Sequence, residues 1–233
     1  MKKKYTHKKA FVISVGGSLI ATPAGLDVEF LKNFRAFIIK KIKAGARFYL
    51  VVGGGVSARN YITAAAETIN ISKSERDWLG ITATRLNAKL LQTILGSVCH
   101  EEIISDPSKK IKSAKKVVVA GGYKPGWSTD YVSVLIAKNN GVKSVINLSN
   151  IDYVYDKDPR QFSDAKKLET ISWAEFRKMI GNRWNPGMNA PFDPIASKEA
   201  DKSGIDVVVM NGANIKNIDD FLSEGKFKGT VIS

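Results

Sequence analysis

The sequence predicts an α/β protein, a single three-layer αβα sandwich whose central sheet is mostly parallel. Short apolar runs rich in β-branched residues alternate along the chain with longer segments in which apolar residues recur every three or four positions. Three of the apolar runs, at residues 11–15, 49–52 and 117–120, end in glycine-rich turns. A chain that alternates strands and helices in this way forms a parallel sheet with helices on both faces.

The first half of the chain contains three predicted strands and three predicted helices. The strands are expected at residues 10–15, 47–52 and 116–120. A helix is expected over residues 27–44, because its apolar residues share one face and Gly45 ends it. Two more helices are expected to begin at Ser57 and Ser74, since a serine hydroxyl caps the free N–H groups of a first turn.

The second half continues the alternation. Helices are expected at residues 129–140, 172–180, 191–203 and 215–224, and strands at residues 143–148 and 206–210. The acidic segment 152–167 is interpreted as a polar loop or hairpin. The segment 181–189 contains too many glycine, asparagine and proline residues for a regular element. This segment is interpreted either as a lid over a site or as a plain surface loop.

Composition limits the class of protein. The chain has 233 residues and 44% hydrophobic residues, which suits one globular domain over residues 10–233, and no apolar run approaches a membrane span. The basic residues 1–9 are expected to be a disordered tip. Cys99 is the only cysteine, so no internal disulfide forms, and His100 beside it lacks the further ligands of a metal site. These features favour a cytoplasmic protein.

The formal net charge of +14 allows two interpretations. A basic surface attracts nucleic acid, but it also suits small anionic ligands. The lysines are scattered over predicted helix ends and polar loops, without interleaved aromatic residues. We therefore predict no specific nucleic-acid partner.

The glycine-rich turns predict phosphate binding. Gly16-Gly17-Ser18, Gly53-Gly54-Gly55 and the segment 121–130 each follow an apolar strand, and the last ends in Ser-Thr-Asp before a helix. Glycine lets the backbone approach a ligand, while hydroxyls and helix N–H groups receive an anion. Because the carboxyl ends of parallel strands share one edge of a sheet, these turns predict a site for several phosphates there. The chain lacks the glycine-lysine motif of P-loop kinases.

Several ordered motifs share a pattern with a known family. They are the three glycine turns, Ala58-Arg59, Asp77-Trp78-Leu79-Gly80-Ile81, Arg85-Leu86-Asn87-Ala88, Asn150-Ile151-Asp152, Val154-Tyr155, Asp158-Pro159 and Asp193-Pro194. Together they resemble the amino-acid kinase superfamily, and within it the archaeal type of uridylate (UMP) kinase. The resemblance implies a kinase that transfers the γ-phosphoryl group of ATP to UMP and yields UDP.

The resemblance also implies roles for individual residues. Residues 10–145 would form the acceptor-binding part and residues 146–233 the ATP-binding part. The expected ATP contacts are Gly17, Ser18, Gly55, Arg59, Ser149, Tyr155 and Asp158. The expected UMP contacts are Gly54, Asp77, Tyr123, Lys124, Pro125, Gly126, Trp127, Ser128 and Thr129. Asp130 would orient the catalytic groups, Mg²⁺ would arrive with ATP rather than at a metal site of the chain, and the subunits would assemble into hexamers.

The sequence departs from the family pattern at three positions. Ser14 stands where many members carry a lysine, and Lys124 is our hypothesis for the cation that replaces it. Tyr153 stands where glycine is usual, which strains the turn if that residue needs a positive φ angle. Tyr123 replaces a small hydroxyl residue, so a tighter acceptor pocket is expected.

Other interpretations of the same residues stay open. Asp77 and Asp130 also fit acidic residues in the first turns of helices, and Lys124 also fits an exposed lysine of a turn. Trp78, Leu86, Leu90 and Ile94 are interpreted as core or subunit-interface residues. Isopentenyl phosphate kinase is an alternative activity, disfavoured because residues 56–59 contain no histidine. A non-catalytic protein that binds nucleotides or oxyanions is a second alternative.

Overall fold

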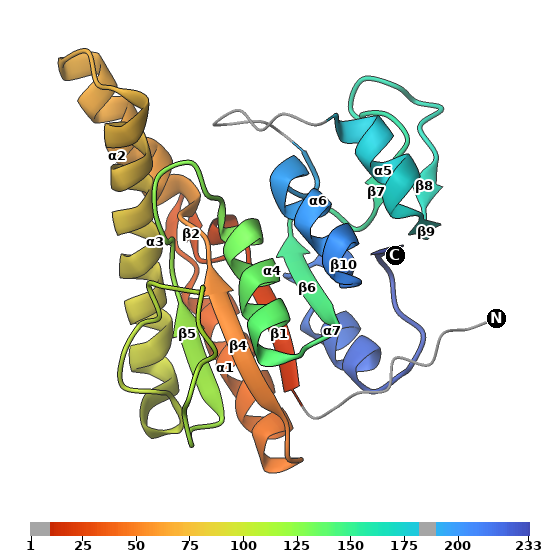
Figure 1. Ribbon diagram of the computed structural model, residues 1–233, viewed down its shortest axis with the longest axis horizontal. Helices are drawn as coiled ribbons and strands as arrows, with labels where there is room; N and C mark the ends of the chain where they lie inside the picture. Colours follow the sequence, from red (N-terminus) through yellow and green to blue (C-terminus); the bar gives the residue numbers. More distant parts are fainter. Residues whose placement is uncertain (1–9, 182–189) are drawn as a thin grey trace.

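A seven-stranded sheet forms the centre of the protein in the computed structural model, which describes residues 10–181 and 190–233 (Figure 1). The strand order is β5-β4-β1-β6-β10-β11-β9. All neighbours pair in parallel except β10 with β11. The strands are β1 (Ala10–Val15), β4 (Arg47–Val52), β5 (Val117–Ala120), β6 (Ser144–Ser149), β9 (Thr170–Ile171), β10 (Asp206–Asn211) and β11 (Thr230–Ile232). The mostly parallel sheet is therefore confirmed.

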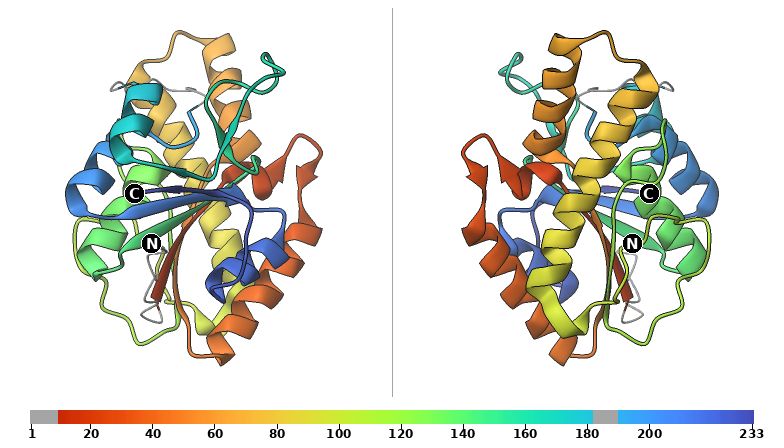
Figure 2. Two further views of the ribbon diagram at one scale, coloured as in Figure 1. Left: turned by 90° about the vertical axis from the view of Figure 1, so that its right-hand side faces the viewer. Right: turned by 90° about the vertical axis from the view of Figure 1, so that its left-hand side faces the viewer.

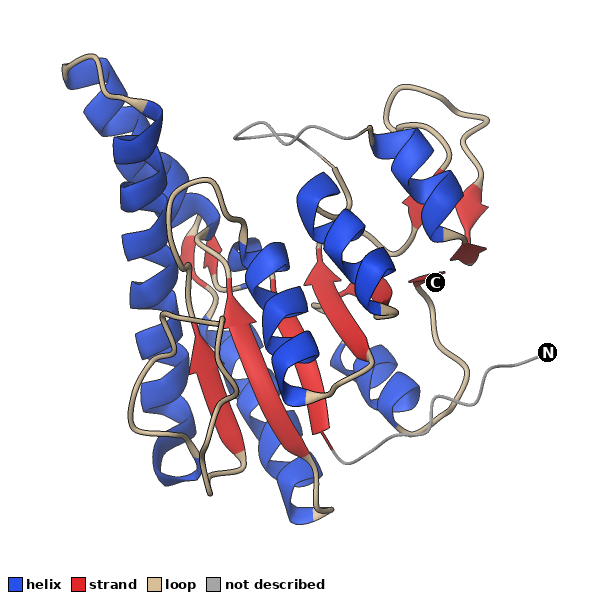
Figure 3. Ribbon diagram, viewed as in Figure 1, coloured by secondary structure: helices blue, strands red, loops and turns tan. Residues whose placement is uncertain are grey.

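Helices cover both faces of this sheet (Figures 2 and 3). The α-helices are α1 (Val28–Lys43), α2 (Gly55–Thr68), α3 (Lys73–Leu95), α4 (Thr129–Asn140), α5 (Trp173–Ile180), α6 (Pro194–Ser203) and α7 (Ile215–Leu222). Two short 3₁₀ helices, η1 (Gly17–Leu19) and η2 (Gly96–Val98), follow β1 and α3. Two small hairpins join β2 (Ala21–Thr22) to β3 (Gly25–Leu26) and β7 (Val154–Tyr155) to β8 (Lys167–Leu168).

Alternation along the strands divides the core into two layers. Phe48 and Leu50 of β4 pack with buried residues of α1, α3 and α7. Their neighbours Tyr49 and Val51 pack on the opposite face, with buried residues of α4, α5 and α6. Because successive side chains of a strand point to opposite faces, one apolar run supplies both cores. The three-layer αβα prediction is confirmed.

Three predicted helix starts are corrected by the capping residues. Helix α2 begins at Gly55, so Ser57 lies inside it and does not cap it. Helix α3 begins at Lys73 because Ser72, rather than Ser74, forms a reciprocal capping box with Glu75. Helix α6 begins at Pro194, three residues later than predicted, since Asp193 caps its first turn.

The hairpin formed by α2 and α3 is largely exposed at one end. Helix α2 carries no buried residue, and Trp78 and Leu86 of α3 are 47% and 61% exposed. The C-terminal half of α3 instead buries Leu91 and Leu95 against the sheet. Trp78 and Leu86 therefore do not belong to the core of the chain. None of the described helices is long and apolar enough to cross a membrane.

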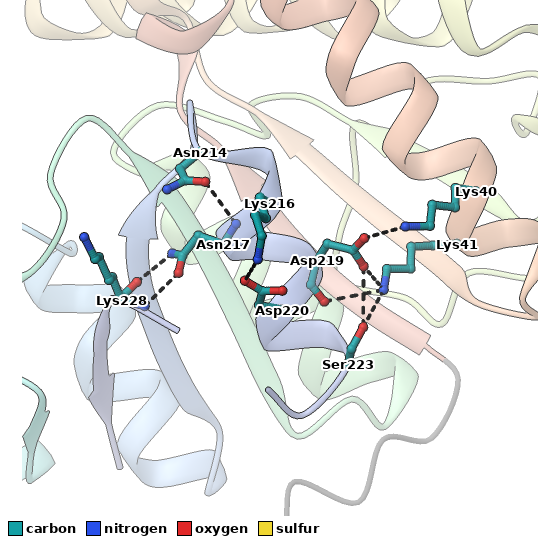
Figure 4. Close-up of polar contacts among 9 residues, drawn as sticks. All are labelled: Lys40, Lys41, Asn214, Lys216, Asn217, Asp219, Asp220, Ser223 and Lys228. Atoms are coloured by element: carbon teal, nitrogen blue, oxygen red, sulfur yellow. Dashed lines mark hydrogen bonds and ion pairs between the residues drawn. The ribbon is translucent and has the colours of Figure 1, made fainter. Parts of the chain in front are cut away.

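Polar contacts attach α7 to α1 and to the chain before β11 (Figure 4). The carboxylate of Asp219 pairs with both Lys40 and Lys41. Burial raises the pKa of Asp219, but the two lysines outweigh this effect and hold it below its ordinary value. The side chain of Asn217 accepts from the N–H of Lys228 and donates to its carbonyl, at 2.7 Å each. These contacts join α7 to α1 and to the chain that leads into β11, the antiparallel strand of the sheet.

Candidate active site

The first two glycine turns interlock at the carboxyl ends of β1 and β4. A Cβ atom on Gly17 would lie 2.1 Å from the backbone nitrogen of Gly55. A Cβ on Gly53 would lie 2.7 Å from the nitrogen of Gly17, and Gly55 itself has a φ of +61°. These glycines are therefore required because the two turns pack directly against each other, in addition to any approach to a ligand. The backbones of the first and second glycine turns therefore lie in direct contact.

Side chains of helix α3 form hydrogen bonds with the backbone of the glycine turns. The Asn87 amide donates to the carbonyl oxygens of Gly53 and Gly54, at 2.9 and 3.1 Å. The Thr84 hydroxyl accepts a hydrogen bond of 2.7 Å from the N–H of Gly122, in the third turn. The sequence assigned no role to Thr84 or Asn87. Their spacing of three residues places them on one helix face, a signal that becomes informative only when the partner backbone is known.

The predicted acceptor loop, residues 123–129, is also held by α3. Arg85 donates from Nε to the carbonyl of Gly122 at 3.2 Å, and from Nη2 to that of Tyr123 at 3.1 Å. The Asp77 carboxylate accepts from the N–H of Gly126 at 2.7 Å. Asp77 therefore contacts the acceptor loop. The resemblance implies a further role for this carboxylate, a contact with the ribose of UMP. Arg85 is a further residue to which sequence reasoning gave no role.

Three aromatic rings contact one another in series, edge to face, beside Lys124. The rings of Tyr123 and Trp127 meet edge to face with centroids 5.4 Å apart, and those of Trp127 and Tyr131 at 4.4 Å. The Lys124 ammonium lies 5.1 Å from the centroid of the Tyr123 ring and 4.6 Å from that of Trp127. Cation–π attraction holds this exposed ammonium over the loop. The structure therefore places Lys124 among the residues expected to bind the acceptor.

Asp130 lies in the first turn of α4, which Ser128 caps by accepting from the N–H of Tyr131. Its carboxylate accepts from the Ser14 hydroxyl at 3.3 Å and from the N–H of Asp193 at 3.2 Å. Burial, and next the nearby carboxylate of Asp193, raise the pKa of Asp130 to about 7. Burial also raises the pKa of Asp193. Ser14 is 3% exposed and supplies a hydrogen bond where a lysine would supply charge.

Two of the residues expected to bind ATP, Ser18 and Ser149, lie beside these turns. Ser18 follows Gly17 in η1, and Ser149 ends β6, the neighbour of β1 in the sheet. Arg59 lies exposed on α2. Tyr155 lies in β7, and the Asp158 carboxylate is paired with Arg160, which lowers its pKa.

Two residues at the end of β10 join this edge, and sequence reasoning missed both. The N–H of Gly212 donates to the carbonyl of Ser149, and Asn211 donates to Asp152 at 2.9 Å. An apolar run that ends in Met210-Asn211-Gly212 was the available signal. Among the described non-glycine residues only Glu224 has a positive φ, so Tyr153 causes none of the strain considered for its turn.

The predicted loop 181–189 falls mostly outside the described residues. Within the described residues, no group of three or more His, Cys, Asp or Glu side chains could hold a metal ion. Cys99 is buried, and burial raises its pKa to about 11, which makes it an unreactive core thiol.

Comparison with known proteins identifies the family. The model of the amino acid kinase family matches residues 9–211. A uridylate kinase from Methanospirillum hungatei is 34% identical over 225 residues, which cover 95% of this chain and 94% of the relative. A uridylate kinase from Pyrococcus abyssi is also 34% identical, over 95% of this chain and 98% of its own length.

A solved structure extends the comparison to three dimensions. The crystal structure of uridylate kinase from Archaeoglobus fulgidus superposes with a TM-score of 0.81 at 32% sequence identity. The match covers 96% of this chain and 99% of that one. The chain therefore belongs to the amino acid kinase family, and within it to the branch of the archaeal uridylate kinases.

Proposed function

We propose that this protein is an ATP-dependent kinase that phosphorylates UMP to UDP. The observation that carries the proposal is the convergence of three glycine turns and the N-terminus of α4 at one edge of the sheet. Such an edge offers backbone N–H groups to several phosphates at once. The similarity to proteins named uridylate kinase, over nearly the whole chain, supports UMP as the acceptor.

The two substrates would approach the edge from opposite sides. UMP would lie over β5 and β4, against Gly54, Asp77 and the loop from Tyr123 to Thr129. ATP would lie over β1, β6 and β10, with its phosphates at Gly17, Ser18, Gly55 and Arg59. Its nucleoside would lie at Ser149, Tyr155 and Asp158. Residues 10–145 would thus supply the acceptor side, and residues 146–233 much of the ATP side.

The chemistry needs positioning more than proton transfer. The UMP phosphate is mostly dianionic near pH 7, since its second pKa is about 6, so its oxygen attacks the γ-phosphorus without a strong base. The enzyme must align two polyanions and stabilise the charge of the transferring group. Thr129 and Asp130 begin α4, where N–H groups lack helical partners and favour an anion. Lys124 supplies a cation on the acceptor side.

Asp130 would orient the catalytic groups between the two substrates. Its hydrogen bonds to Ser14 and Asp193 fix the carboxylate against β1 and the start of α6. The raised pKa leaves this carboxyl partly protonated near neutral pH before substrates bind. Mg²⁺ brought in with ATP would favour its ionised form, whereas the phosphates would favour its protonated form.

Mg²⁺ would enter with ATP. The described residues form no cluster suited to hold a metal by themselves. Mg²⁺ typically keeps several waters and binds phosphate oxygens with few protein ligands, which agrees with that arrangement. We also propose a cytoplasmic location and a hexamer, in line with the family resemblance.

A second candidate is a relative that binds nucleotides without transferring phosphate. Ser14 favours this candidate, because the strand β1 lysine of many family members is absent. A coupled ADP-release assay with ATP, Mg²⁺ and separate acceptors distinguishes the candidates. UMP-dependent ADP release supports the kinase, and release with isopentenyl phosphate instead would reassign the acceptor. Calorimetric binding of ATP and UMP without ADP release would favour the non-catalytic relative.

A further inference from the structure

Four side chains of α3 bind backbone groups of the second and third glycine turns. Asn87 donates to two carbonyls of the second glycine turn, and Thr84 accepts from the third turn. Arg85 donates to the next two carbonyls, and Asp77 accepts from Gly126. Of these four side chains only Arg85 carries a positive charge.

The guanidinium of Arg85 is suited to this position. It is planar and presents several N–H groups in a fixed fork, so one side chain can donate to two adjacent carbonyl oxygens. Without Arg85 those two oxygens would lose their charged donors. Ion pairs in the described residues do not include Arg85, so no carboxylate neutralises its charge.

We infer that Arg85 is a positioning residue for the acceptor: it orients the peptide groups after Gly122 so that the loop binds the UMP phosphate. This inference rests on the proposed function. Arg85 also places a fixed, half-buried positive charge on the acceptor side of a site in which Ser14 supplies none. Lys124, by contrast, is exposed and lies against two aromatic rings.

Kinetic constants for each substrate test this inference. In R85M both carbonyls lose their charged donor, so we expect the KM for UMP to rise about 10- to 100-fold while the KM for ATP changes less than twofold. R85K keeps a charge but loses the fork, so its KM for UMP should also rise, by at least about threefold.

Arg35 provides a matched control at the other end of α3. Its Nε donates to the carbonyl of Ile94 at 2.7 Å, so R35M also breaks an arginine–carbonyl bond to this helix. We expect R35M to keep both KM values of the wild-type protein. Thermal unfolding of all variants separates loss of fold from loss of acceptor binding.

The outcomes separate the two proposals. An R85M protein with unchanged KM for UMP, or with equal losses for UMP and ATP that R35M shares, overturns the role of Arg85. An R85K protein identical to wild type overturns the requirement for the fork. A wild-type protein that neither binds nor phosphorylates UMP overturns the proposed function instead.

Discussion

The buried carboxyl of Asp130 predicts a pH-dependent cost in stability. Its pKa is about 7 in the folded protein, against an ordinary value of 3.8. Between these values the folded state binds more protons than the unfolded state, so the free energy of unfolding falls as pH rises. The cost is absent well below pH 4 and complete above about pH 7. The substitution D130N removes the charge and therefore the cost.

The magnitude follows from the pKa difference. Each unit corresponds to about 1.36 kcal/mol, and about two units separate pH 5 from the folded-state pKa, which sets a ceiling of about 2.7 kcal/mol. Asp130 as a residue is intermediate in burial rather than fully buried, so we expect about 1–2 kcal/mol after screening by solvent. The stability of D130N relative to wild type should thus be greater at pH 8 than at pH 5 by this amount.

Asparagine suits the site geometrically. Its carbonyl oxygen can accept from the Asp193 N–H, while its amide donates to the Ser14 hydroxyl, which also accepts. Urea unfolding of wild type and D130N at pH 5 and pH 8 measures the difference. D220N, which removes an exposed pairing with Lys216, is the control and should show less than about 0.5 kcal/mol of pH dependence.

A relative stability that does not change with pH would refute the reasoning about Asp130. The same variant should lose activity, by about 100-fold or more in kcat, because an amide would no longer orient the catalytic groups as the carboxylate does. If D130N is more stable but less active than wild type, the Asp130 carboxylate lowers stability and is kept for its function. Lower stability at both pH values would instead mean that the carboxylate supports the fold.

Three further predictions concern the turns and the loop. G17A places a Cβ 2.1 Å from the nitrogen of Gly55, so we expect it to destabilise the protein by about 3 kcal/mol or more in urea unfolding, and near-normal stability would contradict the interlocked turns. N87A removes the donor to both carbonyls of the second turn and should cost about 1–3 kcal/mol by the same measurement, whereas a loss below about 0.5 kcal/mol would show that water replaces it. K124A should raise the KM for UMP about tenfold without changing stability, since the ammonium is exposed; unchanged turnover and unchanged nucleotide affinity would remove Lys124 from the site.

The sequence predicts the main strands and helices well because their signals are local. The strand over residues 10–15 and the helix at 129–140 match the structure to the residue, since apolar periodicity and glycine stops mark their limits. The strands β7 and β8 form a separate hairpin around the segment 152–167, which agrees with the hairpin that the sequence allowed there. The strands β9 and β11 contain only two and three residues and carry no periodicity, and they pair with each other within the main sheet, so they could not be predicted.

Some features of the candidate site also have local sequence signals, and others do not. Glycine turns after apolar strands marked the edge where ligands are expected, because each turn is contiguous in sequence. Thr84, Arg85 and Asn87 bind backbone groups more than 30 residues away, and nothing local distinguishes them from other polar residues of a helix. The raised pKa of Asp130 likewise depends on burial and then on Asp193, both of which arise only through the fold.

Transfer of labelled phosphate tests the central claim most directly. The protein is incubated with Mg²⁺, UMP and ATP labelled in the γ-phosphate, and the nucleotides are separated. We predict that the label appears in the β-phosphate of UDP, in a reaction that requires UMP. Label that remains in ATP, or that appears only as inorganic phosphate, would contradict the assignment of this protein as a UMP kinase.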